Sequence, residues 1–96
     1  MNRVERIEEQ LQEAFAPTEL VVRDDSHKHI GHPGAQSGLG HFHVHIISER
    51  FRGVPLLERH RLIYAALNDM MKTDIHALSL NATAPDTVIT PKSEHP

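Results

Sequence analysis

The most constraining feature of this sequence is a regular alternation of residue type between positions 40 and 48. Phe42, Val44 and Ile46 alternate with three histidines. Successive side chains of a β-strand point to opposite faces of its sheet. The segment Gly40 to Ser48 therefore predicts a strand with its apolar face on a core and its histidine face turned away. The three histidines are His41, His43 and His45.

Two helices and two further strands are predicted around this strand. The helices have apolar residues at spacings of three and four, and the first begins with a capping box formed by Asn2 and Glu5. The further strands are short runs with apolar centres and polar ends. In chain order the elements are expected at Asn2 to Phe15, Glu19 to Asp24, Gly40 to Ser48, Pro55 to about Met71, and Ile75 to Ala82.

The order helix, strand, strand, helix, strand predicts the topology of the sheet. The helix between the second and third strands is a crossover, which makes that pair parallel with a right-handed connection. The first two strands are expected to pair antiparallel across the long segment Asp25 to Gly40. The predicted fold class is α+β, with a three-stranded mixed sheet covered by helices on one face. The inner face of the second helix is expected to carry Leu56, Ile63, Leu67 and Met70.

Length and composition limit the class of protein. The 96 residues make one domain, expected at 1–84, with a polar and mobile C-terminal tail at 85–96. No run approaches the ~20 apolar residues of a membrane helix. Charges near the N-terminus stand where a secretory signal has apolar residues. The chain has no cysteine, which fits a reducing compartment, so a cytoplasmic location without membrane contact is expected.

Nine histidines without a cysteine make metal binding the first chemical hypothesis. Imidazole is the commonest metal ligand, and six of the nine histidines lie between positions 27 and 45. Histidines two apart on a strand are about 7 Å apart, which suits zinc. The alternative, favoured for His43 and His45, is a polar outer face of the sheet. His76 is predicted to share the strand face of Leu78 and Leu80, either as a ligand or as a half-buried structural histidine.

Basic residues concentrate between positions 50 and 61, where four arginines meet a single acidic residue. This stretch is a candidate surface for phosphates or for an acidic partner. The alternative is that the arginines cap and brace the second helix. The net charge of −3 argues against constitutive nucleic-acid binding. The absence of a thiol nucleophile, a G-x-S-x-G turn and an H-E-x-x-H pair predicts a protein that is not an enzyme. The candidate surface consists of Arg50, Arg52, Arg59, His60 and Arg61.

Several motifs together resemble the BolA family over roughly positions 3 to 83. The motifs are Asp24-Asp25-Ser26 followed by His29, Gly40-His41-Phe42-His43-Val44, Arg50-Phe51-Arg52-Gly53, Arg59-His60-Arg61-Leu62-Ile63-Tyr64-Ala65-Ala66-Leu67, and Ile75-His76-Ala77-Leu78. The resemblance implies a domain similar to class II KH folds, with the order helix–strand–strand–helix–helix–strand and a short turn of helix near Val54.

The resemblance also implies two roles. In the first, the chain partners a monothiol glutaredoxin and shares a [2Fe–2S] cluster, in iron–sulfur trafficking or in iron and stress regulation. The family's C-terminal ligand histidine matches His76, and its loop ligand matches His29 best, with His32 as the other candidate. His41 matches the histidine before the strand phenylalanine.

In this role the isolated chain holds no cofactor. A glutaredoxin cysteine and glutathione supply the sulfur ligands, while the two imidazoles bind one iron, as in Rieske centres. The second implied role is a DNA-binding transcriptional regulator of the stress response and of cell morphology. That role would use the KH-like surface and the basic stretch Arg50 to Arg61.

Overall fold

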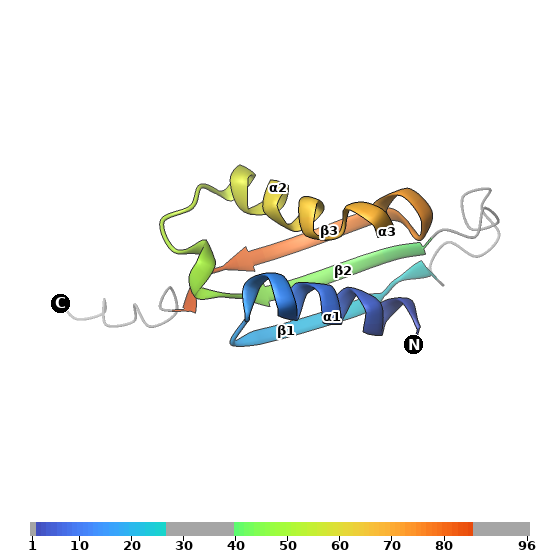
Figure 1. Ribbon diagram of the computed structural model, residues 1–96, viewed down its shortest axis with the longest axis horizontal. Helices are drawn as coiled ribbons and strands as arrows, with labels where there is room; N and C mark the ends of the chain where they lie inside the picture. The colour runs from blue at the N-terminus through green and yellow to red at the C-terminus, as the bar shows by residue number, and fades with distance from the viewer. Residues whose placement is uncertain (1, 27–39, 86–96) are drawn as a thin grey trace.

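The computed structural model describes residues 2–26 and 40–85 (Figure 1). The predicted C-terminal tail, apart from Pro85, therefore lies outside the described residues, as do His27, His29 and His32. In chain order the elements are α1 (Arg3–Phe15), β1 (Glu19–Asp24), β2 (Gly40–Ile47), the 3₁₀ helix η3 (Glu49–Phe51), α2 (Leu56–Ala66), α3 (Asn68–Thr73) and β3 (Ile75–Thr83).

Helix α1 starts at the capping box predicted from the sequence. The Asn2 side chain accepts a hydrogen bond from the Glu5 amide at 2.8 Å, and the Glu5 carboxylate accepts one from the Asn2 amide at 3.1 Å. These bonds satisfy two backbone donors that a helix start leaves unpaired. The helix ends at Phe15, because Ala16 adopts a left-handed backbone with φ 44° and Pro17 follows.

The three strands form one mixed sheet in the order β1-β2-β3 (Figure 1). Strand β1 pairs antiparallel with β2, and Val22 lies opposite Val44. Strand β2 pairs parallel with β3, and Val44 lies opposite Leu80. The predicted α+β class, strand directions and sheet type are confirmed, while the KH-like label stays a prediction.

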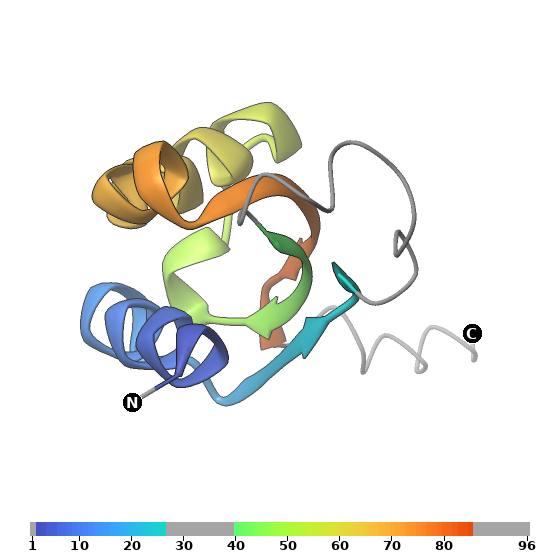
Figure 2. The same cartoon turned by 90° about the vertical axis from the view of Figure 1, so that its right-hand side faces the viewer.

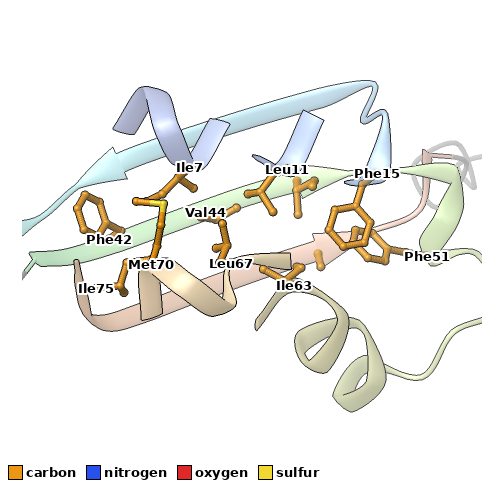
Figure 3. Close-up of a cluster of buried hydrophobic side chains, with 12 residues drawn as sticks. Ile7, Leu11, Phe15, Phe42, Val44, Phe51, Ile63, Leu67, Met70 and Ile75 are labelled. Atoms are coloured by element: carbon orange, nitrogen blue, oxygen red, sulfur yellow. The ribbon is translucent and has the colours of Figure 1, made fainter. Parts of the chain in front are cut away.

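The helices lie on one side of the sheet and enclose the core between them (Figures 2 and 3). Strand β2 sends Phe42, Val44 and Ile46 into this core, and the histidines between them are only half-buried. The alternation along β2 therefore separates core-facing side chains from outward-facing ones, as predicted. From the other elements the core takes Ile7, Leu11, Phe15, Phe51, Ile63, Leu67, Met70, Ile75 and Ala82.

The single helix predicted from Pro55 to Met71 is wrong in two respects. The helix is interrupted at Leu67, whose backbone (φ −103°, ψ 15°) leaves helical geometry and separates α2 from α3. In addition, Leu56 is exposed, although its spacing placed it on the inner face. The short helical turn expected near Val54 lies earlier, at η3, and Val54 only closes the turn that follows η3 by donating to the Phe51 carbonyl.

None of the helices within 2–26 and 40–85 has the length and apolar character needed to cross a membrane. The expected cytoplasmic location stays a prediction.

Candidate functional site

His76 lies at an irregularity between the two parallel strands. Gly40 pairs with Ile75, but the next pair is His41 with Ala77, so His76 is an extra residue in β3. Such a bulge changes which face a side chain occupies. His76 is exposed as a result, while Leu78 and Leu80 pack against the core. The prediction that His76 shares their face is therefore wrong, because the bulge shifts the alternation by one residue.

The imidazole of His76 lies against the imidazole of His41 from the neighbouring strand. The two ring centroids are 5.0 Å apart and the ring planes are tilted by 49°. These residues are 35 positions apart in the sequence, and the parallel pairing of β2 with β3 brings them together. We call this contact the histidine pair.

The start of β2 is fixed to the end of β1 next to the histidine pair. The His41 amide donates to Ser26 Oγ at 2.9 Å, and the His41 carbonyl accepts from the Asp25 amide at 2.8 Å. The Ser26 amide in turn donates to Asp24 Oδ1 at 2.8 Å. The Asp24-Asp25-Ser26 motif therefore closes a turn that ties β1 to β2 beside His41.

The two ends of the segment 27–39 both meet at this place. Ser26, which precedes the segment, bonds to His41, and Gly40, which follows it, donates its amide to the Asp74 carbonyl at 2.9 Å. His29 and His32 lie inside that segment, outside the described residues. The described structure thus places His76 and His41 at the strand ends where the histidine-bearing segment leaves and rejoins the sheet.

His43 and His45 follow His41 along the half-buried face of β2, further from the bulge. The His45 Nε2 atom lies 3.0 Å from Glu19 Oε2 on the neighbouring strand. This orienting carboxylate was not predicted from the sequence, because Glu19 reaches His45 only through the antiparallel pairing of β1 with β2. Among the described residues no group of three or more His, Asp or Glu side chains can hold a metal ion, so the zinc hypothesis for His41, His43 and His45 gains no support.

The basic stretch behaves mainly as a brace. Arg59 donates to the Val54 carbonyl at 2.7 Å and to the Ala82 carbonyl at 2.8 Å, which ties the start of α2 to the end of β3. Arg50 donates to the Ala14 carbonyl at 2.7 Å, and Arg52 pairs with the Glu49 carboxylate. The alternative that these arginines stabilise the fold is therefore favoured for Arg50, Arg52 and Arg59.

The remaining candidates of the basic stretch lie on α2. Arg61 is 67% exposed and lies 3.7 Å from Glu58, a separation at which an exposed ion pair contributes little. His60 beside it is half-buried. The same helix exposes apolar side chains that the sequence analysis missed, because a helix with apolar residues on several faces gives no clear inner side. These exposed side chains are Leu56, Leu57, Leu62 and Tyr64.

The fold and the site define a class of protein: a small α+β domain with a one-sided sheet and a surface pair of histidines at one end of that sheet. The chain belongs to the BolA family, since the family described as "BolA-like protein" matches residues 11–87.

Relatives and solved structures agree with this assignment. The DNA-binding transcriptional regulator BolA of Escherichia coli is 46% identical over 77 residues, which cover 80% of this chain and 70% of the relative. The chloroplastic protein BOLA1 of Arabidopsis thaliana is 41% identical over 87 residues, 88% of this chain and 54% of the relative. The solved BolA domain of SufE1 from Arabidopsis thaliana superposes with a TM-score of 0.80 at 43% identity, covering 92% of this chain and 98% of that domain.

The length of the match differs among these proteins. The chain spans 54% of Arabidopsis BOLA1 and 24% of the Arabidopsis SufE-like protein 1, chloroplastic/mitochondrial, with which it is 42% identical over 88 residues. The similarity therefore establishes the BolA domain and its fold.

Proposed function

We propose that this chain is a non-enzymatic adaptor that partners a monothiol glutaredoxin and shares a [2Fe–2S] cluster through histidine ligands. The observation that carries the proposal is the exposed position of His76, at the bulge beside both ends of the histidine-bearing segment. An exposed imidazole at a strand end is accessible to an iron atom bound by another protein, which a histidine buried in the core is not.

The donor set of the chain fits such a cluster. The chain has nine histidines and no cysteine, so it can supply imidazole nitrogens but no thiolate. His76 would be one ligand, and His29 or His32 the other. A partner cysteine and glutathione would complete the set, and replacing thiolates by neutral imidazoles raises the reduction potential of such a cluster.

Substitution of His76 tests the ligand assignment. The chain is mixed with a cluster-loaded monothiol glutaredoxin and glutathione, and visible absorption and circular dichroism are recorded. The wild-type chain is expected to change both spectra relative to the loaded glutaredoxin alone, and the His76→Ala variant is expected to leave them unchanged. The matched control is His43→Ala, which removes a half-buried imidazole from the same face away from the bulge and should behave as wild type.

Two outcomes would overturn the proposal. If wild-type chain leaves the glutaredoxin spectra unchanged, no shared cluster forms. If His76→Ala changes the spectra as wild type does, His76 is not a ligand. Thermal unfolding of each variant without a partner confirms that the fold is retained. Separate His29→Ala and His32→Ala variants then identify the loop ligand, since only the variant that lacks the ligand should lose the mixed spectrum.

A second candidate function is DNA binding by a transcriptional regulator, supported by the name of the Escherichia coli relative. On this chain it would depend on the exposed Arg61 and on the half-buried His60 beside it, because Arg59 is already bonded to two carbonyls. Duplex affinity should then fall with salt, and Arg61→Ala should weaken binding and reduce the slope of log affinity against log salt by about 1. Absent or salt-independent binding would exclude this role.

A further inference from the structure

We propose that His41 is a positioning residue for His76: the ring of His41 holds the imidazole of His76 in the orientation in which it meets the partner's iron. This inference rests on the proposed function, and it assigns to His41 a role separate from that of the ligands. It starts from the contact between the two rings at 5.0 Å.

His76 needs such support because of where it lies. Strand β3 is at the edge of the sheet, and the bulge places the His76 side chain on the exposed side of that edge. An exposed side chain occupies several rotamers, and fixing one of them on binding costs conformational entropy. Among residues 2–26 and 40–85, the ring of His76 packs against the ring of His41.

His41 is well placed to give this support. It belongs to the central strand β2, which is paired on both sides. Its amide is bonded to Ser26 Oγ and its carbonyl to the Asp25 amide, and its side chain is half-buried. The direction of the effect therefore runs from the half-buried ring of His41, carried by an anchored backbone, to the exposed ring of His76.

The geometry of the contact fits a packing role. Aromatic rings prefer tilted or offset arrangements with centroids about 4.5–7 Å apart, and such pairs contribute beyond their buried area. The observed separation of 5.0 Å and tilt of 49° fall in this range. Groups that orient a metal ligand without touching the metal commonly change metal affinity about 10–100-fold when they are removed.

Two substitutions at position 41 separate positioning from ligation. His41→Phe keeps a ring but has no nitrogen, whereas His41→Ala removes the ring. If His41 positions His76, a complex with His41→Phe should keep the mixed cluster spectrum, and a complex with His41→Ala should lose its cluster about 10-fold faster under chelator challenge. His43→Ala, two residues along the same strand, should lose the cluster at the wild-type rate.

A measurement on the free chain tests the same inference without any cluster. Nuclear magnetic relaxation of the His76 imidazole, in histidine-labelled protein, reports how ordered the ring is. The ring should become more mobile in His41→Ala and stay as in wild type in His41→Phe and His43→Ala. Amide spectra of each variant show whether the sheet is intact.

The cluster-loss and relaxation experiments together test the positioning role of His41. Loss of the cluster in both His41 variants would make His41 a ligand and overturn the positioning role. Unchanged His76 mobility and cluster lifetime in His41→Ala would overturn it as well. If His76 mobility responds as expected but wild-type chain forms no mixed cluster, the positioning contact stands and the proposed function fails, so the two failures are distinguishable.

Discussion

Asp74 connects several elements of this small domain through its carboxylate and its backbone carbonyl. Its carboxylate accepts hydrogen bonds from Arg3 at 3.2 Å and Arg6 at 3.1 Å, both on α1, and from the neighbouring hydroxyl of Thr73. Its carbonyl accepts from the Gly40 amide at the start of β2. One residue therefore connects the first helix, the central strand and the turn before β3. The Thr73 hydroxyl, followed by the two guanidinium groups, lowers the pKa of Asp74 below its usual value of 3.8.

Replacing Asp74 by Asn should destabilise the protein in a pH-dependent way. A carboxyl whose pKa is lowered by folding stabilises the folded state above its unfolded pKa, and that contribution disappears as the pH falls through the folded pKa. Asp74→Asn should therefore lower the free energy of unfolding by about 1 kcal/mol at pH 7, and by much less near pH 2. Urea unfolding at both pH values measures this difference.

Glu9→Gln provides the control for this experiment, because Glu9 is an exposed carboxylate on the same helix as the two arginines. The control substitution should change the free energy of unfolding by less than about 0.5 kcal/mol at either pH. An Asp74→Asn effect of equal size at pH 7 and pH 2 would contradict an electrostatic role for this carboxylate.

Gly40 occupies a position where no side chain fits. A Cβ atom there would lie 2.6 Å from Cε2 of Phe42 and 2.9 Å from Ser26 Oγ. The Phe42 ring is buried in the core and Ser26 Oγ is bonded to His41, so neither can move freely. Gly40→Ala should lower the free energy of unfolding by about 1–3 kcal/mol, because overpacking forces these neighbours apart. An unfolding midpoint equal to that of wild type would show that Phe42 and Ser26 move aside at little cost in free energy.

At the scale of elements, Arg59 decides how α2 is attached to the sheet. Helix α2 buries only Ile63, so its apolar packing is limited. The Arg59 guanidinium compensates by donating to the Val54 carbonyl just before α2 and to the Ala82 carbonyl near the end of β3. Hydrogen bonds from a charged donor are among the stronger ones in proteins.

Arg59→Ala should therefore lower the free energy of unfolding by about 2 kcal/mol. Arg61→Ala, two residues along the same helix, should change it by less than about 0.5 kcal/mol, because Arg61 is exposed. Denaturant unfolding of the two variants makes the comparison. Equal effects would mean that the two bonds of Arg59 contribute no more than a surface charge does.

The elements differ in how well the sequence predicts them. Strand β1 has the predicted bounds, and α1 begins and ends where its capping box and Pro17 place it. The residue periodicity did not predict the break at Leu67, since Ile63, Leu67 and Met70 keep a spacing that also fits one continuous helix. No glycine or proline marks the break, and all three side chains reach the core on either side of it.

At the scale of the whole molecule, one apolar layer holds α1, η3, α2, α3 and the sheet together. Leu11 is fully buried between α1 and the sheet, whereas Leu57 on α2 is 64% exposed. Leu11→Ala should lower the free energy of unfolding by about 2–5 kcal/mol, a large share of the roughly 5–10 kcal/mol expected for a domain of this size. Leu57→Ala removes the same atoms from a solvated position and should change it by less than about 0.5 kcal/mol.

Thermal or urea unfolding of the two leucine variants tests this organisation. A Leu11→Ala variant as stable as Leu57→Ala would contradict a single core shared by α1 and the sheet. Figure 3 shows Leu11 with its neighbours from the other elements in this layer.

The sequence by itself determined the features that depend on local periodicity. The alternation along β2 sorted the core face from the histidine face, and the helical spacing and cap set the bounds of α1. The tertiary structure decided the features that depend on register between distant segments. The bulge that exposes His76, its contact with His41 and the hydrogen bond from Arg59 to the Ala82 carbonyl all arise from strand pairing or packing between residues far apart in the chain. A backbone period repeats within a few residues and can be read locally, whereas register is set by the sum of many weak contacts across the whole domain.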